Sequence, residues 1–427
     1  MARVMAISEL DYPTSKRVAV ILITGVLVVL GALGFGRFSM SLVLPSMRQG
    51  LGLSYTELGT ITSANFMGYL SFSLGSGLLA SRWGPRRVIA ISLMLSSLSM
   101  IATGFSNGFW VPLIWMALVG VGTAGANVPV MAMVSSWVSP QRRGLASGLL
   151  IMGSGIGLTI NGVVIPHWVT QPGNQGWRDV WIWLGIVTVC IAIWAAVALR
   201  DRNVHSPAVV GGSGKQPSIW VQMFNVFKQK PVLLRLALVY FAFGFSYVVF
   251  TTFFGVYLTE TRGWSAFAAG RLWKWVGVFS LPSGFIWGWL SDRIGRRWGL
   301  FVVYLMHAGC LVAFATLPWA TGITVAALVY GLSIFSIPAI MNAACGDEAG
   351  PYLAPTAYGA ITVAFGLGQM AAPQAVGVML DIGWGMVQTL WLSAAVALLG
   401  AVGALFLHVP FATLVGRRLK EVDHRTL

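Results

Sequence analysis

Long apolar runs separated by short polar segments dominate this sequence. A helix needs about 20 apolar residues to cross the roughly 30 Å hydrocarbon core of a bilayer, and windows of that length locate twelve such runs. The predicted spans are 19–46, 57–80, 86–106, 109–137, 145–170, 179–199, 232–258, 266–290, 298–317, 321–345, 355–380 and 384–409. The sequence therefore predicts an all-α membrane protein with twelve transmembrane helices arranged as two six-helix bundles.

The composition agrees with a chain that is solvated mainly by lipid. Hydrophobic residues make up 57% of it, charged residues only 9%, and the mean hydropathy is +0.79, which is outside the range of soluble domains. A net charge of +15 would suggest nucleic acid in a soluble protein. Here the basic residues fall between apolar runs, so we expect membrane lipid and no nucleic acid as partners. The three cysteines lie inside apolar runs at unrelated spacings, which predicts neither disulfides nor a metal site.

A basic motif occurs twice, each time after the second predicted span of a half. The segment GWLSDRIGRR covers 288–297, and a shortened copy, GLLASRWGPRR, begins at Gly77. A parallel duplication of this kind is typical of transporters whose two halves rock against each other. We predict an N-terminal bundle in 1–199, a cytoplasmic central loop in 200–231 that is rich in Gly, Ser and Pro, and a C-terminal bundle and tail in 232–427.

The distribution of basic residues predicts the orientation of the chain. Most of the 27 lysines and arginines fall in segments that the predicted spans place on one side of the membrane, together with both termini. Short cytoplasmic loops carry such an excess. Both termini are therefore predicted to be cytoplasmic.

The twelve-span plan, the long central loop and the G-x-L-x-D-R-x-G-R-R pattern resemble the major facilitator superfamily over essentially the whole chain. Within it, GFGRFSMSLVLPSM in the first span and GFSYVVFTTF in the seventh resemble the YbfB-like bacterial branch. The resemblance implies a monomeric secondary transporter of the bacterial inner membrane, which works by alternating access and binds its substrate between the halves. It does not imply which substrate is carried.

The resemblance also implies that the basic motif is a cytoplasmic gate. In the family its aspartate reaches a helix N-terminus in the opposite half, where free N–H groups and the helix dipole favour a carboxylate. Asp292 is thus expected near the start of the fifth span at Gly144, whereas Ser81 offers the eleventh span only an uncharged contact. The alternative is that the motif serves only to anchor the helices. The gate residues are Ser81, Arg82, Arg86, Asp292, Arg293 and Arg296.

Buried cations are the main evidence about the substrate. Arg37 lies deep in the first span, eight residues before Pro45, and an ionisable residue at such depth is costly unless it faces a cavity or a partner. Lys274 in the eighth span either faces the cavity or reaches toward the interface. All twelve acidic residues lie in tails, loops or span ends, which predicts that an anionic substrate completes the site. Alternatively, Arg37 hydrogen-bonds to neighbouring spans as a structural clamp.

Uncharged polar residues in mid-span are candidates for the rest of the binding site. Each is also a candidate for hydrogen bonding between helices, which is the more common role of an intramembrane asparagine. In the eleventh span, Tyr358, Thr362, Phe365 and Gln369 share one helical face. The substrate-binding candidates besides Arg37 and Lys274 are Asn65, Asn127, Asn161, Tyr247, Tyr330, Asn342 and Gln369.

No motif predicts catalysis or a cofactor. GVGTAG at 120–125 fits a dinucleotide-binding pattern but lies inside an apolar run, and there is no phosphate-binding loop for ATP. We therefore expect no enzymatic activity, no cofactor and no metal. The leading prediction is transport of a small organic anion, coupled to a proton or to a counter-anion. Efflux of a neutral or cationic amphipathic compound is the alternative, and a non-transporting receptor or scaffold is the remote one.

Overall fold

The computed structural model describes residues 15–138, 142–171, 173, 175–201, 227–228 and 231–407. The predicted tails and most of the predicted central loop lie outside these residues. Within them the chain is helical and contains no strand. The elements are α1 (Ser15–Val29), η2 (Leu30–Phe35), α2 (Met40–Leu51), α3 (Tyr55–Trp83), α4 (Pro85–Gly104), α5 (Trp110–Trp137), α6 (Arg143–Val169), α7 (Gly176–Ala198), α9 (Val232–Val256), η4 (Tyr257–Thr261), α10 (Ala266–Ser280), α11 (Ser283–Ile294), α12 (Arg296–Thr316), α13 (Ala320–Gly331), α14 (Ser336–Asp381) and α15 (Met386–Leu405).

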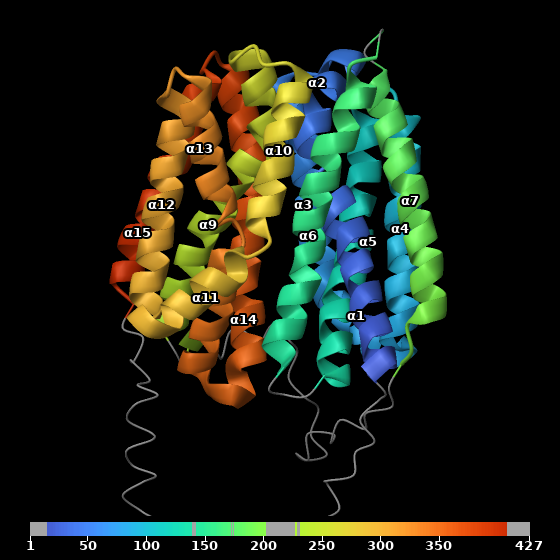
Figure 1. Cartoon of the computed structure of the whole chain (residues 1–427), viewed down its shortest axis with the longest axis vertical. Coiled ribbons are helices and arrows are strands. Elements are labelled where there is room, and N and C mark those ends of the chain that lie inside the picture. The colour runs from blue at the N-terminus through green and yellow to red at the C-terminus, as the bar shows by residue number, and fades with distance from the viewer. Residues whose placement is uncertain are drawn as a thin grey trace, which may run out of the picture.

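These helices form twelve membrane spans in two bundles, as predicted. Ten stretches of the described residues are long and apolar enough to cross a bilayer. The more polar α3 and the broken pair α10 and α11 complete the twelve. Figure 1 shows α1 to α7 on one side of the molecule and α9 to α15 on the other, which we call the N-half and the C-half.

Three of the predicted spans are divided: the first, the eighth and the tenth, in which the turn at 332–335 separates α13 from α14. The first span consists of α1, the π-helix η2, a turn at 36–39, and α2. The eighth span is divided into α10 and α11 at Leu281 and Pro282. Proline removes a backbone donor and so favours such a break. In a bilayer, irregular backbone is tolerated only where protein or a cavity surrounds it.

The helix α14 contains the end of the tenth span and all of the eleventh. Its first part ends near Asp347, which pairs with Arg296 at the start of α12. Its last residue, Asp381, bonds to the start of α3 at the other end of the molecule. The chain therefore reverses direction between these two points, in the stretch that contains Pro351 and Pro355.

The repeated basic motif forms the same turn in both halves. Gly84 joins α3 to α4 at φ 84° and ψ 138°, and Gly295 joins α11 to α12 at φ 90° and ψ 149°. A side chain is strained at such positive φ values, which explains the glycines. The duplication that the sequence predicts thus extends to the backbone conformation.

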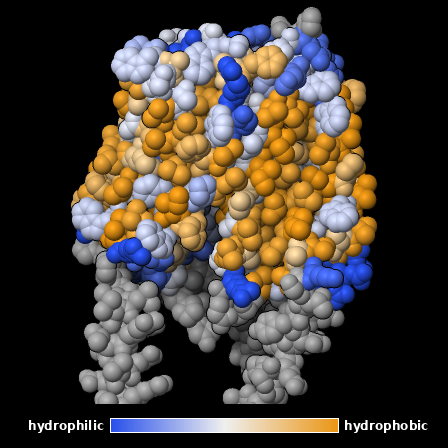
Figure 2. Space-filling model, in the orientation of Figure 1, coloured by the Kyte–Doolittle hydropathy of each residue, from blue (hydrophilic) through white to orange (hydrophobic). Residues whose placement is uncertain are grey.

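The start of α1 and the end of α15 lie at the same end of the molecule, at the bottom of Figure 1. We call this end the terminal face and the other end the opposite face. Figure 2 shows a broad hydrophobic belt at mid-height and hydrophilic residues gathered toward the two ends. This distribution matches a bilayer flanked by two aqueous phases.

The two halves touch near the opposite face along a line of glycines, which we call the glycine seam and define as Gly59, Gly162, Gly255 and Gly377. A Cβ on Gly59 would lie 2.2 Å from the Pro373 carbonyl oxygen, and one on Gly255 would lie 2.0 Å from that of Ser41. Across the seam, helix backbones are therefore in direct contact, which small residues permit in membranes.

Toward the terminal face the halves diverge. The helix α6 packs along α10 but not along α11, although α11 continues the same span. Gly77 on α3, Gly144 on α6 and Gly288 on α11 all face open space. The described helices are thus closed at the opposite face and open toward the terminal face.

Candidate functional site

Arg37 lies at the break in the first span, in the turn between η2 and α2. Glycines make this backbone geometry possible. Gly34 packs against Gly157 on α6, where an added Cβ would come within 2.9 Å of the Gly157 Cα, and a Cβ on Gly36 would lie 2.5 Å from the Ala32 carbonyl oxygen. Single π-helical turns inside membrane and soluble helices are frequent at functional sites.

Side chains from three other N-half helices satisfy the carbonyl groups that the break leaves free. Asn161 donates to the Gly34 oxygen at 2.8 Å, and Asn65 donates to the Gly36 oxygen at 3.4 Å. Thr123 donates to the Ala32 oxygen at 3.1 Å. The Asn161 amide is thus committed to the backbone that carries Arg37, and the Asn65 amide joins that backbone to the Met116 oxygen of α5, to which it donates at 3.2 Å. Both asparagines are therefore positioning residues for the turn.

The Arg37 guanidinium lies between two aromatic rings of α3. Its central carbon is 4.6 Å from the centre of the Phe66 ring and 4.5 Å from that of Tyr69. Its Nε and one terminal nitrogen are buried without a hydrogen bond, and no described carboxylate forms an ion pair with it. Stacking on two rings holds a cation favourably but leaves its N–H donors free for a ligand.

Asn127 and Tyr247 extend the site from Arg37 into both halves. The Asn127 amide donates to the Tyr69 hydroxyl at 3.0 Å, and its own oxygen is buried without a partner. Tyr247 comes from α9 in the C-half and is close enough to Arg37 for electrostatic interaction. Arg37, Asn127 and Tyr247, three of the substrate-binding candidates, therefore lie around the Tyr69 side chain.

Aromatic rings of the C-half pack against Tyr247 and against one another. Phe243 stacks on Tyr247 with ring centres 5.1 Å apart, and Phe365 lies 5.6 Å from Phe243. The Tyr330 hydroxyl and the Gln369 amide nitrogen are buried in this half without hydrogen bonds. The predicted C-half candidates thus supply unpartnered, uncharged polar atoms among stacked rings.

Two predicted residues lie elsewhere. The Lys274 ammonium lies 4.8 Å from the ring centre of Trp275, an exposed residue of α10, and the Lys274 backbone packs against Gly162 of α6. Asn342 is exposed on the part of α14 that runs to the terminal face. Neither residue joins the cluster around Arg37.

The predicted gate residues occupy the terminal face in two different arrangements. In the C-half, Arg296 forms ion pairs with Asp292 and Asp347, and Arg293 stacks on Trp289 at 3.8 Å. The side chain of Asp292 is 54% exposed, and its ion pair is with Arg296 of its own motif.

In the N-half the same motif contacts its own helix and the end of α7. Ser81 donates to the Leu78 carbonyl of its own helix at 2.8 Å. Arg86 donates to the Ala196 oxygen at 2.6 Å, and Arg82 is exposed.

Four residues close the opposite face, and we call them the polar clamp: Arg48, Tyr55, Glu260 and Asp381. Glu260 of the C-half accepts from Arg48 at 3.1 Å and from the Tyr55 hydroxyl at 2.6 Å. Asp381 accepts from the backbone N–H groups of Tyr55 at 3.0 Å and Thr56 at 2.7 Å. The C-half thus offers two carboxylates to the N-half.

Asp381 binds the N-terminus of α3, where the first N–H groups of a helix have no partner of their own. Ser54 and Glu57 satisfy two further donors there through a capping box. Burial, and after it the hydrogen bond to Glu260, raise the pKa of Tyr55 to about 12, so the phenol remains a donor at neutral pH. The hydrogen bond from Tyr55 therefore persists over the physiological pH range.

The polar clamp was not predicted, because in the sequence its members appear only as polar residues at span ends. A signal was present, since Glu260 and Asp381 are acidic residues at the ends of spans in a strongly basic chain. The sequence does not say which helix end each carboxylate meets, because that depends on how the halves pack.

We expect acid to loosen the clamp through Asp381. Partial burial would raise the pKa of this carboxyl, but hydrogen bonds from Thr56, Tyr55 and Ser54 outweigh it and lower the pKa below its ordinary value. The contact therefore contributes fully above the ordinary pKa of an aspartate, near 4, and is lost as the pH falls through the lowered pKa. Spin labels at Gln49 and Ile382 should report separation of the halves below about pH 4.

The matched control for this titration is Asp381→Asn, which removes the ionisable group. Arg48, Glu57 and Glu260 are the other charged groups around the start of α3. Only the difference between the wild type and Asp381→Asn therefore measures the contribution of Asp381. An identical pH response in both proteins would show that Asp381 does not hold this face closed.

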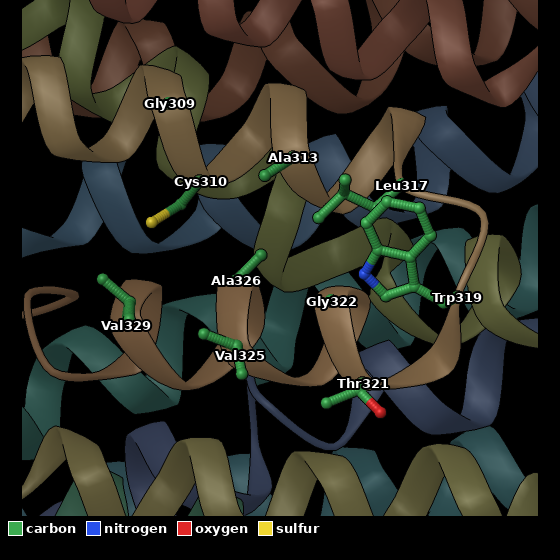
Figure 3. Close-up of a pocket in the computed structure, with 10 residues that line it drawn as sticks. All are labelled: Gly309, Cys310, Ala313, Leu317, Trp319, Thr321, Gly322, Val325, Ala326 and Val329. Carbon is green, nitrogen blue, oxygen red and sulfur yellow. The ribbon is translucent and has the colours of Figure 1, made fainter.

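An apolar crevice of about 440 Å³ lies between α12 and α13 on the outer side of the C-half (Figure 3). Its walls include Cys310, Trp319 and Val325, and the last two are exposed on the surface. None of the predicted site residues lines it, and it offers no charged group. It is a lipid-facing groove rather than part of the site around Arg37.

Comparisons with known proteins agree on one family and one fold. The family model described as Major Facilitator Superfamily matches residues 26–373. The chain is 24% identical over 395 residues to the probable sulfoacetate transporter of Cupriavidus necator, covering 87% of this chain and 90% of that protein. It is 25% identical over 314 residues to the hexuronate transporter of Bacillus subtilis, covering 70% and 72%.

A solved structure shares the fold of this chain. It is a bacterial homologue of the human lysosomal transporter Spinster in an inward-facing, unoccupied conformation. The TM-score is 0.71 at 16% sequence identity, with 96% of this chain and 98% of that chain covered.

Proposed function

Because this chain belongs to the major facilitator superfamily, a family of transporters rather than enzymes, we propose that it carries a small organic anion across the bacterial inner membrane. The terminal face is the cytoplasmic face in this proposal, in keeping with its excess of basic residues. The halves expose the site alternately to the two sides. Transport is coupled to a proton or to exchange for a second anion.

The observation that supports an anionic substrate is the state of Arg37. Its charge is enclosed between Phe66 and Tyr69, two of its nitrogens have no hydrogen bond, and no described carboxylate pairs with it. A buried charge without a partner is costly. A carboxylate could accept two hydrogen bonds from the free edge of a guanidinium.

The relatives support the same substrate class. One is named as a sulfoacetate transporter and the other as a hexuronate transporter, and both substrates are small organic acids. The identities are near a quarter, so these names support the class of substrate rather than one compound.

The direct test is binding and uptake by the purified protein. We expect small carboxylates, and not lipophilic cations, to raise its melting temperature, and the same carboxylates to accumulate in liposomes that contain it. Stabilisation by lipophilic cations alone would contradict the proposal and favour efflux of cationic compounds.

In the proposed cycle, opening of the polar clamp is accompanied by closing of the terminal face. Asp292 is exposed and is held only by Arg296 of its own motif, so it is free to approach the N-terminus of α6 when that face closes. Such a contact contributes up to about 2 kcal/mol. Ser81 has no charge to contribute.

We therefore expect Asp292→Asn to slow transport by roughly five- to thirtyfold. Ser81→Ala should change the rate less than about twofold, because Ser81 bonds only within α3. Initial uptake rates in liposomes, normalised to the amount of folded protein, measure both. Equal losses in the two variants would mean that the motif acts only as an anchor.

A further inference from the structure

The site around Arg37 contains a single positive charge among the residues that the structure describes. Its nearest groups are the rings of Phe66 and Tyr69 and the phenol of Tyr247. Lys274, the other basic residue predicted within a span, stacks on the exposed ring of Trp275. The charge available to a ligand is therefore one.

Three basic side chains nearer the span ends are already engaged. Arg48 pairs with Glu260. Arg178 donates to the Gly104 oxygen at 3.0 Å, and Arg262 donates to the Ala315 oxygen at 3.0 Å. None of them is free to neutralise a second anionic group on a ligand at Arg37.

The surroundings of Arg37 also disfavour a second negative charge directly. The faces of aromatic rings carry partial negative charge, which attracts Arg37 and repels an anion. The C-half contributes Tyr240, Phe243, Tyr247 and Phe365, which stack on one another with ring centres 4.5 to 6.5 Å apart. A carboxylate placed among them would be buried without a counter-ion.

The same region is suited to neutral polar groups. The Asn127 oxygen can accept a hydrogen bond, the Gln369 nitrogen can donate, and the Tyr330 hydroxyl can do either; all three are buried without partners. Hydroxyl, carbonyl or amide groups on a ligand would satisfy them at no cost in charge.

Building on the proposed function, we infer that the site selects monoanions: one carboxylate binds Arg37, and the rest of the substrate is uncharged and bears neutral hydrogen-bonding groups. Dianions of the same shape are rejected because their second charge has no partner. Sugar acids with one carboxylate fit this description, and carboxylates that also carry a sulfonate do not.

Isosteric ligand pairs test the inference on the wild-type protein. Succinate and succinamate, phthalate and phthalamate, and sulfoacetate and methylsulfonylacetate differ within each pair by one negative charge and little in shape. Titration calorimetry in lipid nanodiscs at neutral pH measures the affinity of each compound. In every pair that binds, the monoanion should bind roughly a hundredfold more tightly than the dianion. Arg37→Gln should weaken the monoanion strongly and reduce the difference within the pair.

The outcomes separate this inference from the proposed function. If the dianions bind as tightly as the monoanions or more tightly, and this binding is lost in Arg37→Gln, monoanion selection is wrong. The proposed transport of an organic anion would still stand. Binding of no member of any pair, or binding that is unchanged in Arg37→Gln, would overturn the proposed function and the inference with it.

Discussion

Replacement of Arg37 by alanine is expected to abolish anion binding while leaving the protein folded. Truncating one partner of a buried charge pair typically costs about 2–5 kcal/mol, which is roughly thirtyfold to several thousandfold in affinity. Without ligand the variant should melt at the same temperature as the wild type or higher, because an uncompensated buried charge is removed. Calorimetry with a bound monocarboxylate and thermal unfolding without it measure the two effects.

Lys274→Ala is the matched control for Arg37→Ala. Both residues are basic and lie within spans, but the Lys274 ammonium stacks on the exposed ring of Trp275, whereas Arg37 stacks on Phe66 and Tyr69. Its loss should leave affinity within about twofold of wild type. If Arg37→Ala instead lowers the melting temperature of the free protein and keeps the affinity, Arg37 is a structural clamp and the proposed site is wrong.

Substitution of Gly59 by alanine is expected to hold the protein open at the opposite face. The added Cβ would lie 2.2 Å from the Pro373 carbonyl oxygen in the other half, and two backbones leave no flexible atom to move aside. Overpacking of this kind costs about 1–3 kcal/mol, which would lower the ratio of closed to open molecules by roughly five- to 150-fold. Spin labels at Gln49 and Ile382 should then report a longer distance.

The N-half itself should fold normally in Gly59→Ala. Alanine favours a helix over glycine by about 1 kcal/mol, and the clash arises only when α14 approaches α3. Gly309→Ala on the surface of α12 is the control, since a Cβ there meets nothing within 4 Å. An unchanged label distance in Gly59→Ala would show that the seam is not the contact that opens. The exposed Cys190 should be replaced by serine before labelling.

The architecture could be predicted from the sequence because one physical constraint governs it. Every backbone group in lipid must be satisfied within a helix, so apolar runs of sufficient length define the spans and the repeated motif defines the two halves. The breaks at Arg37 and at Pro282 were not predicted. They depend on groups from other helices, such as Asn161 and Thr123, which satisfy the backbone that a break exposes.

The candidate site was predicted in part for a related reason. Burial cost identifies Arg37 from the sequence alone, and the shared helical face identifies Phe365 and Gln369. The direction of a side chain around its helix is harder to predict, and Lys274 and Asn342 illustrate this. The role of an asparagine is also hard to predict. The sequence does not distinguish an amide that hydrogen-bonds a backbone carbonyl from one that binds a ligand.

The clamp could not be predicted because it joins residues far apart in sequence across two rigid bodies. Asp381 meets the N-terminus of α3 only because α14 and α3 run side by side near the opposite face. Asp292 is expected to make the same kind of contact at the terminal face, where this C-half carboxylate would meet the N-terminus of an N-half helix. The two faces would then be closed by the same kind of contact.

The glycine seam has a thermodynamic consequence for the balance between the two states. Glycine has no side-chain rotamers, so bringing the seam together immobilises few side chains, and parting it frees few. Conformational entropy of side chains then favours neither state. The small free-energy difference between the two states then depends on hydration of the clamp carboxylates and on binding of the substrate. Ion gradients and ligand concentration can alter these two contributions, and repeated cycling depends on them.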